Sequence, residues 1–322
     1  MIQKVGSVQP VMASPPSILI NPLLKILWQF KSMRVKKLSL KNKELNRIAP
    51  SRYLRGRIER RHIRSWYLNN SRDLDIYLPP AYDREPGKRF PVLYMHDGNN
   101  LFFPELAFGG MPWQVDKMLN RLISHRLVED LIVVGVHNTP GRDNEYTWTR
   151  MQTRWGSEGG NGERYAHFLV NEAKPLVDHH YRTLSGPEET GVMGSSLGGL
   201  ISFYLGLYFP HVFRKIGMVS PSFWWGHRQA LRDAAQIQRG LKLWLDMGTR
   251  EGGSRIAVAR NYNIQNTRLM KRILESRGYR EGEDLAYLED RGGKHNEWFW
   301  GQRLHLPLIY FYGSRKSLIM TA

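Results

Sequence analysis

Residues 190–213 read "TGVMGSSLGGLISFYLGLYFPHVF": a short apolar run, a corner rich in glycine and serine, and then apolar residues at helical spacing. The corner, "GSSLG" at 194–198, has the pattern G-x-S-x-G between a strand and a helix, as a nucleophile elbow requires. In such a turn the central residue, Ser196, is held in a strained backbone conformation, and a glycine on either side avoids clashes. The stretch therefore predicts that the Ser196 hydroxyl projects at the carboxyl end of a sheet, above the start of a helix whose dipole favours negative charge. The alternative is a plain glycine-rich turn.

The rest of the chain repeats the alternation of strand and helix. Segments with the composition of strands lie at 72–82, 90–98, 131–138, 190–196, 215–220, 241–248 and 285–290. Apolar residues at spacings of three and four mark helices at 162–181 and 198–213. Short apolar strands separated by helices are typical of an α/β fold, so we expect a mainly parallel central sheet with helices on both faces.

Size and composition limit the classes of protein. With 322 residues and 41% hydrophobic content, the chain can bury a large core. It has no cysteine, which excludes disulfides, thiolate metal sites and a cysteine nucleophile. We predict one catalytic α/β domain at 56–322, preceded by a basic and partly apolar extension at 1–55.

The formal net charge of +18 is concentrated in this first part of the chain. Residues 31–64 contain 13 Lys/Arg and two Glu, and 13 − 2 gives +11. The apolar stretch at 18–30, interrupted by Pro22 and Lys25, is too short to span a membrane, and no signal-peptide cleavage site follows it. An anionic membrane surface is therefore a candidate partner of residues 18–64, with a cytoplasmic or membrane-peripheral location. Nucleic acid is not favoured, because no nucleic-acid-binding motif accompanies the charge. The alternative is a solvated extension whose apolar helix packs on the domain.

A serine nucleophile needs a base. In proteins with this elbow the order along the chain is serine, acid and histidine, so the base lies downstream of Ser196. Four histidines follow Ser196, namely His211, His227, His295 and His305. His295 lies in "DRGGKHNEWFW" (290–300), a glycine-rich loop directly after the last apolar strand, where an imidazole can reach the serine. We predict that His295 is the base.

Two carboxylates in "LKLWLDMGTREGG" (241–253) are candidates for the acid that orients the base. Asp246 lies at the end of the strand, where its side chain is committed to the sheet or the turn. Glu251 lies in the following loop and has the longer reach. The prediction favours Glu251 and keeps Asp246 as the alternative.

An oxyanion hole would complete the site, with backbone N–H groups aimed at the charge that develops on the attacked carbonyl. The residue after the nucleophile, Leu197, supplies one amide. The loop "HDGNN" at 96–100 offers Asn99 as the second donor. His96 and Asp97 precede the nucleophile and are interpreted as residues that structure this loop.

Several stretches in this order resemble one known family. They are "DIYLPPAY", "VLYMHDGNNLF", "EYT", "YAHFLVNEAKPLVDHHYRT", "GSSLGGLIS", "SPSFWW", "DMGTREG" and "GGKHNEWFW". They resemble the enterochelin-esterase-like branch of the α/β hydrolases, which is related to feruloyl esterases and mycolyltransferases, over about residues 57–313. The resemblance implies Ser196 as nucleophile, Glu251 as acid, His295 as base, and the amides of Asn99 and Leu197 as oxyanion hole. Nothing in the sequence requires a metal or another cofactor.

We expect aromatic and cationic side chains at the rim of this site. They would contact the substrate, which we expect to be a small-molecule ester. The predicted substrate-binding residues are Trp113, Arg142, Trp224 and Trp298. They suit an aromatic or bulky acyl group with anionic character, as in siderophore or hydroxycinnamoyl esters, although loop tryptophans also serve as core. The favoured function is a serine carboxylesterase. The alternatives are an acyltransferase that uses the same acyl-enzyme, or a non-catalytic binding protein that acts through its basic extension.

Overall fold

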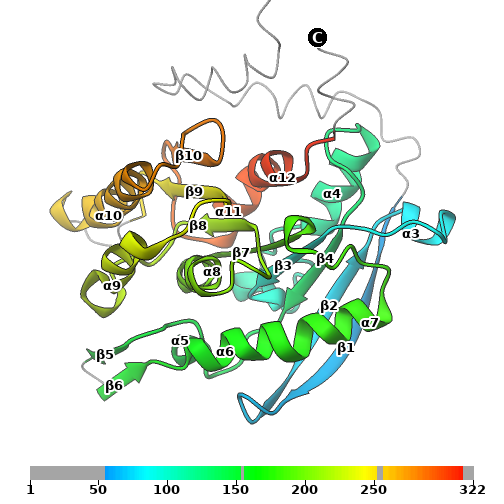
Figure 1. Cartoon of the computed structure of the whole chain (residues 1–322), viewed down its shortest axis with the longest axis horizontal. Coiled ribbons are helices and arrows are strands. Elements are labelled where there is room, and N and C mark those ends of the chain that lie inside the picture. Colours follow the sequence, from blue (N-terminus) through cyan, green and yellow to red (C-terminus); the bar gives the residue numbers. More distant parts are fainter. Residues whose placement is uncertain (1–54, 154–155, 252–256, 315–322) are drawn as a thin grey trace, which may run out of the picture.

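A computed structural model describes residues 55–153, 156–251 and 257–314, so the predicted extension and its apolar stretch lie almost wholly outside the described residues. The described chain forms an eight-stranded sheet in the order β1-β2-β4-β3-β7-β8-β9-β10 and a separate hairpin of β5 and β6 (Figure 1). Both pairings of β2 are antiparallel, and the remaining neighbours in the large sheet are parallel. The predicted mainly parallel α/β fold is confirmed.

The strands are β1 (Arg57–Ser65), β2 (Asn70–Leu78), β3 (Val92–His96), β4 (Ile132–Val136), β5 (Arg150–Thr153), β6 (Gly156–Gly159), β7 (Thr190–Ser195), β8 (Lys215–Val219), β9 (Lys242–Gly248) and β10 (Leu285–Asp290). The α-helices are α3 (Ala81–Arg84), α4 (Val115–Ser124), α5 (Arg142–Glu145), α6 (Gly162–Phe168), α7 (Lys174–His180), α8 (Leu197–Tyr208), α9 (Trp225–Asp233), α10 (Ala257–Ser276), α11 (Glu297–Arg303) and α12 (His305–Tyr312). Short turns of 3₁₀-helix are η1 (Gly98–Asn100), η2 (Phe108–Gly110), η4 (Pro187–Glu189) and η5 (Ala234–Gln236), and a π-helical turn, η3 (Leu169–Ala173), joins α6 to α7.

The sheet separates two apolar cores, because successive side chains of a strand point to opposite faces. On β3, Val92 and Tyr94 belong to one core, whereas Leu93 and Met95 belong to the other. Helices α6 to α10 contribute to the first core and α4, α11 and α12 to the second. Figure 1 shows α6 to α9 and α12 on different sides of the strands, so helices cover both faces as predicted.

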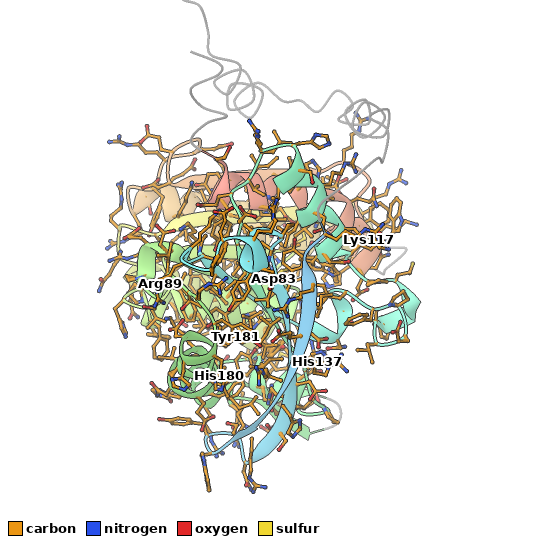
Figure 2. The ribbon with its side chains drawn as sticks, turned by 90° about the vertical axis from the view of Figure 1, so that its right-hand side faces the viewer. Asp83, Arg89, Lys117, His137, His180 and Tyr181 are labelled. Carbon is orange, nitrogen blue, oxygen red and sulfur yellow. The ribbon has the colours of Figure 1, made fainter. Side chains whose placement is uncertain are left out.

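The basic residues nearest the domain form an ordered strand. β1 pairs along its whole length with β2 at the edge of the sheet, and Glu59 accepts a hydrogen bond of 2.8 Å from the hydroxyl of Tyr181, which follows α7. Figure 2 looks onto this edge, with the blue ribbon of β1 and β2 in front and Tyr181 and His137 on either side of it. His137 Nε2 lies 2.7 Å from a carboxylate oxygen of Asp75 on β2. Arg60 of β1 donates to Asp75 at 2.7 Å as well, so β1 and this cation belong to the folded sheet.

Three elements differ from the sequence-based expectation. β1 and the β5–β6 hairpin were not assigned as strands, because their alternation of apolar residues is weak. The helix expected at 162–181 is interrupted by the π-helical turn at 169–173. Within the described residues, no helix is both long and apolar enough to cross a bilayer.

Candidate active site

Ser196 occupies the turn between β7 and α8, with φ of 58° and ψ of −120°. This positive-φ conformation is rare for a residue with a side chain and is the strain that a nucleophile elbow stores. A Cβ atom added to Gly194 would lie 2.9 Å from the backbone of Gly198 and 2.9 Å from the ring of His96, so no larger residue fits there. At Gly198 the space is only tight, with His96 Cβ at 3.3 Å.

Three predicted residues meet in a hydrogen-bonded chain. His295 Nε2 lies 2.9 Å from Ser196 Oγ, and His295 Nδ1 lies 2.9 Å from Glu251 Oε2. Glu251 is buried, while the imidazole is partly open to solvent. The His295 and Trp300 rings also pack edge to face, with ring centroids 4.8 Å apart. A general base between a hydroxyl and a buried carboxylate is the arrangement that activates a serine.

Backbone contacts join the loops that carry the acid and the base. The amide of Thr249 donates to Asp290 O at 2.9 Å, and the amide of Arg250 donates to Gly293 O at 2.9 Å. The amide of Gly292 donates to the Thr249 hydroxyl at 2.8 Å. β9 and β10 are parallel neighbours, so both loops leave the same edge of the sheet and support each other.

Within the described residues, Asp246, the alternative acid, bonds to Trp244 and Arg303 and not to His295. It is fully buried on β9, where its carboxylate accepts from Trp244 Nε1 at 2.7 Å and from Arg303 Nη2 at 2.8 Å. Its side chain is committed within the fold, for the reason anticipated from its position in the strand. Of the other downstream histidines, His211 follows α8, His227 lies in α9 and His305 begins α12.

The two predicted oxyanion donors belong to turns that begin at neighbouring strands. Leu197 is the first residue of α8, and the first amides of a helix have no acceptor within it. Asn99 lies in η1, just before Asn100, whose amide makes the first bond of that turn, to Asp97 O at 2.8 Å. A Cβ atom on Gly198 would lie 3.5 Å from Asp97 Oδ2, so this loop packs directly on the elbow.

Asp97 and His96 hold that loop in place, as the sequence suggested. Asp97 has φ of 56° and receives two hydrogen bonds from Arg142, at 2.6 and 2.8 Å, and one from Asn138 at 2.7 Å. His96 is buried, with Nδ1 2.9 Å from the hydroxyl of Tyr165, and burial lowers the pKa of its imidazole to about 3. A neutral, enclosed imidazole on β3 acts as a packing group rather than a base.

The predicted substrate-binding residues divide into two pairs. Trp113 is only 5% exposed and packs on Trp300, and Arg142 is engaged by Asp97, so in this structure both have structural roles instead of free surfaces. Trp224 is 36% exposed and Trp298 is 50% exposed. Sequence position alone could not separate these pairs, because all four follow the carboxyl ends of strands or their loops.

Ser220 and Arg303 contact Glu251 and were not predicted, and Trp300 contacts Ser220. Ser220 Oγ donates to Glu251 Oε1, and the Trp300 indole and the Arg303 guanidinium both donate to Ser220 Oγ. Their only sequence signal is the position of Ser220 directly after a buried strand. In the described ranges, no group of three or more His, Asp or Glu side chains is arranged to hold a metal ion.

Burial of two neutral histidines leads to a stability prediction. Burial lowers the pKa of His96 to about 3 and that of His305 to about 4, below the unfolded value of about 6.5. The unfolded chain therefore binds more protons between these values, and the free energy of unfolding falls as pH drops through this window. We expect each histidine to contribute a loss of about 2 kcal/mol between pH 7 and pH 5.

Urea unfolding of the wild type and of His305→Asn at both pH values measures this effect. The variant should lose about half of the pH dependence that the two histidines share. An unchanged difference between pH 7 and pH 5 in His305→Asn would contradict the assignment.

Comparison with known proteins assigns the chain to a family. The model of the family described as "Putative esterase" matches residues 65–311. The chain is 26% identical over 253 residues to the uncharacterized protein YbbA of Bacillus subtilis, covering 77% of this chain and 96% of that protein. It is 32% identical over 92 residues to the iron(III) enterobactin esterase of Escherichia coli, which covers 26% of this chain and 21% of that protein.

A solved structure supports the same placement at the level of fold. The enterobactin esterase FES of Shigella flexneri superposes with a TM-score of 0.63 at 21% identity, covering 82% of this chain and 59% of that protein. The chain therefore belongs to the "Putative esterase" family, in its enterochelin-esterase-like branch, and is a carboxylic ester hydrolase of the α/β-hydrolase fold.

Proposed function

We propose that this protein is a serine carboxylesterase in which Ser196 is the nucleophile, His295 the base and Glu251 the acid. The observation that carries the proposal is the unbroken chain of contacts from Ser196 Oγ through the imidazole to Glu251, with 2.9 Å at each step. The strained elbow supports it, since such strain persists where a hydroxyl must be presented.

The reaction follows from these contacts. Ser196 Oγ attacks the ester carbonyl carbon while its proton passes to His295 Nε2, and Glu251 stabilises the imidazolium through Nδ1. The amides of Asn99 and Leu197 receive the developing oxyanion. The imidazolium then protonates the departing alcohol, which leaves an acyl-enzyme. A water molecule, deprotonated by His295, attacks the acyl carbon and releases the acid and free Ser196.

For the substrate we propose an ester of an aromatic or bulky acid, of the siderophore or hydroxycinnamoyl kind. Two observations support this: Trp224 and Trp298 expose aromatic surface in segments that follow β8 and β10, and a relative is named for the hydrolysis of iron(III) enterobactin. Arg142 could meet an anionic group only by loosening its bonds to Asp97, so we assign anion recognition to it only as a second role.

Covalent labelling tests the proposed nucleophile. A fluorophosphonate probe should add once to the folded chain, and intact-mass measurement followed by peptide mapping should locate the adduct on Ser196. A folded protein that hydrolyses p-nitrophenyl acetate but takes up no probe would contradict the proposal.

An acyltransferase would form the same acyl-enzyme and pass it to an alcohol. Product analysis with and without a polyol acceptor separates the two, because a hydrolase yields free acid in both. The described geometry gives no reason for a non-catalytic binding protein.

The role of the basic extension is a separate proposal, because residues 18–54 lie outside the described structure. We propose that residues 18–64 contact an anionic membrane surface. Co-sedimentation with phosphatidylserine vesicles that weakens as salt rises would support it, since exposed charges are screened within about 10 Å at 0.1 M salt. Sedimentation that does not respond to salt would oppose it.

A further inference from the structure

Glu251 is held on both of its oxygen atoms. Oε2 faces His295 Nδ1 at 2.9 Å, and Oε1 accepts from the amide of Gly248 at 2.7 Å and from the hydroxyl of Ser220. The residue is 6% exposed, so protein groups replace most of the water that would otherwise solvate the carboxylate. Rotation of this carboxylate would break contacts on both sides.

The direction of the Ser220 hydroxyl is determined by its neighbours. Its oxygen receives the indole N–H of Trp300 at 2.9 Å and a guanidinium N–H of Arg303 at 2.7 Å. Both groups can only donate, so they occupy the two lone pairs of the hydroxyl oxygen. The single hydroxyl proton is then left for Glu251 Oε1.

Arg303 is the buried cation that supports this arrangement. It lies on α11, which begins two residues after His295, and its guanidinium contacts Asp246 Oδ1 at 2.8 and 3.1 Å and Asp290 Oδ2 at 3.2 Å. It also lies 3.5 Å from Glu251 Oε1. One planar group thus links β9, the end of β10 and the helix after the proposed base, which a flexible ammonium could not do.

We propose that Ser220 and Arg303 are positioning residues, which hold Glu251 through Oε1 so that Oε2 stays directed at His295. The proposal rests on the proposed function, because it assumes that Glu251 orients the base. It also gives Asp246 an indirect role, through the two residues that contact Glu251. The carboxylate of Asp246 binds Arg303, and its main-chain oxygen accepts a hydrogen bond of 3.0 Å from the Ser220 amide.

Ser220→Ala is the direct test. Ser220 has φ of 45°, and alanine is strained to the same degree there, so the change is confined to the hydroxyl. We expect turnover per active site to fall about tenfold to a hundredfold, as for loss of a hydrogen bond to a charged group, with KM on p-nitrophenyl acetate unchanged. Active sites are counted with the fluorophosphonate probe, so a merely structural defect lowers the count and not the turnover per site.

Ser65→Ala is the matched control. Ser65 is also buried, but its hydroxyl oxygen accepts a backbone hydrogen bond from Leu68 N at 3.0 Å, and it lies far along the chain from the proposed triad. Its turnover per site should equal that of the wild type.

The role of Arg303 is tested by non-additivity. Arg303→Lys keeps the charge beside Asp246 but loses the planar guanidinium that also reaches Ser220. We therefore expect a drop in turnover per site that is smaller than the drop for Ser220→Ala. The double variant Ser220→Ala/Arg303→Lys should be slowed by less than the product of the two single effects, because both residues hold the same Oε1 atom of Glu251. Multiplying effects would overturn the role of Arg303.

The outcomes for Ser220 separate this inference from the proposed function. Turnover per site of Ser220→Ala within twofold of the wild type, with Ser196→Ala inactive, would overturn the inference and leave the esterase mechanism intact. A Ser196→Ala variant with full activity would overturn the proposed function itself.

Discussion

Ser196→Ala should reduce hydrolysis of short p-nitrophenyl esters by about 10⁴ to 10⁶ in turnover. The hydroxyl is the only group lost, and its oxygen lies 2.9 Å from His295 Nε2. Without it the imidazole has no bound nucleophile to deprotonate, so only the oxyanion donors and substrate binding can accelerate the reaction. The measurement is steady-state turnover on purified, folded protein, with the fluorophosphonate adduct expected to disappear as well.

Ser195→Ala is the control for this prediction. Ser195 is the last residue of β7 and is buried, one position before the elbow, so its loss should leave substantial activity. If the Ser195 variant is inactive and the Ser196 variant is active, the assignment of the nucleophile is reversed.

Glu251→Gln should lower turnover by about 10² to 10⁴, the second large effect. Two donors, the Gly248 amide and the Ser220 hydroxyl, meet at the Oε1 position. They favour the amide oxygen of glutamine there, which directs its NH₂ group at His295 Nδ1. The imidazole would then carry its proton on Nε2, the tautomer that cannot accept a proton from Ser196.

Asp246→Asn is the matched comparison, since it makes the same chemical change in a carboxylate of the same network. It should retain more turnover per site than Glu251→Gln but unfold at a temperature several degrees lower, because it removes a partner of the buried Arg303, at a cost of about 3 kcal/mol. Turnover and thermal melting of both variants decide the matter. A nearly unaffected Glu251→Gln together with an inactive, folded Asp246→Asn would assign the acid role to Asp246.

The features of this protein that could be predicted from sequence are those that local patterns specify. The alternation of short apolar strands with helices predicted the mainly parallel sheet, because strand and helix periods are visible within a few residues. The elbow around Ser196 is likewise contained in one strand, one turn and one helix, so its glycines point to a backbone constraint within "GSSLG" itself. The position of Glu251 beyond its strand, and of Asp246 within it, favoured Glu251, which is the carboxylate that lies against His295 in the structure.

Only the tertiary structure decided what surrounds these groups. Ser220 and Arg303 are 83 positions apart, and they meet because β8 lies beside β9 in the sheet and α11 returns across the carboxyl ends of the strands. Trp113 and Trp298 both follow predicted strands, yet one is enclosed against Trp300 and the other exposed. Strand order and the return path of a helix arise from packing the whole chain at once, so no local pattern in the sequence can specify which side chains they bring together.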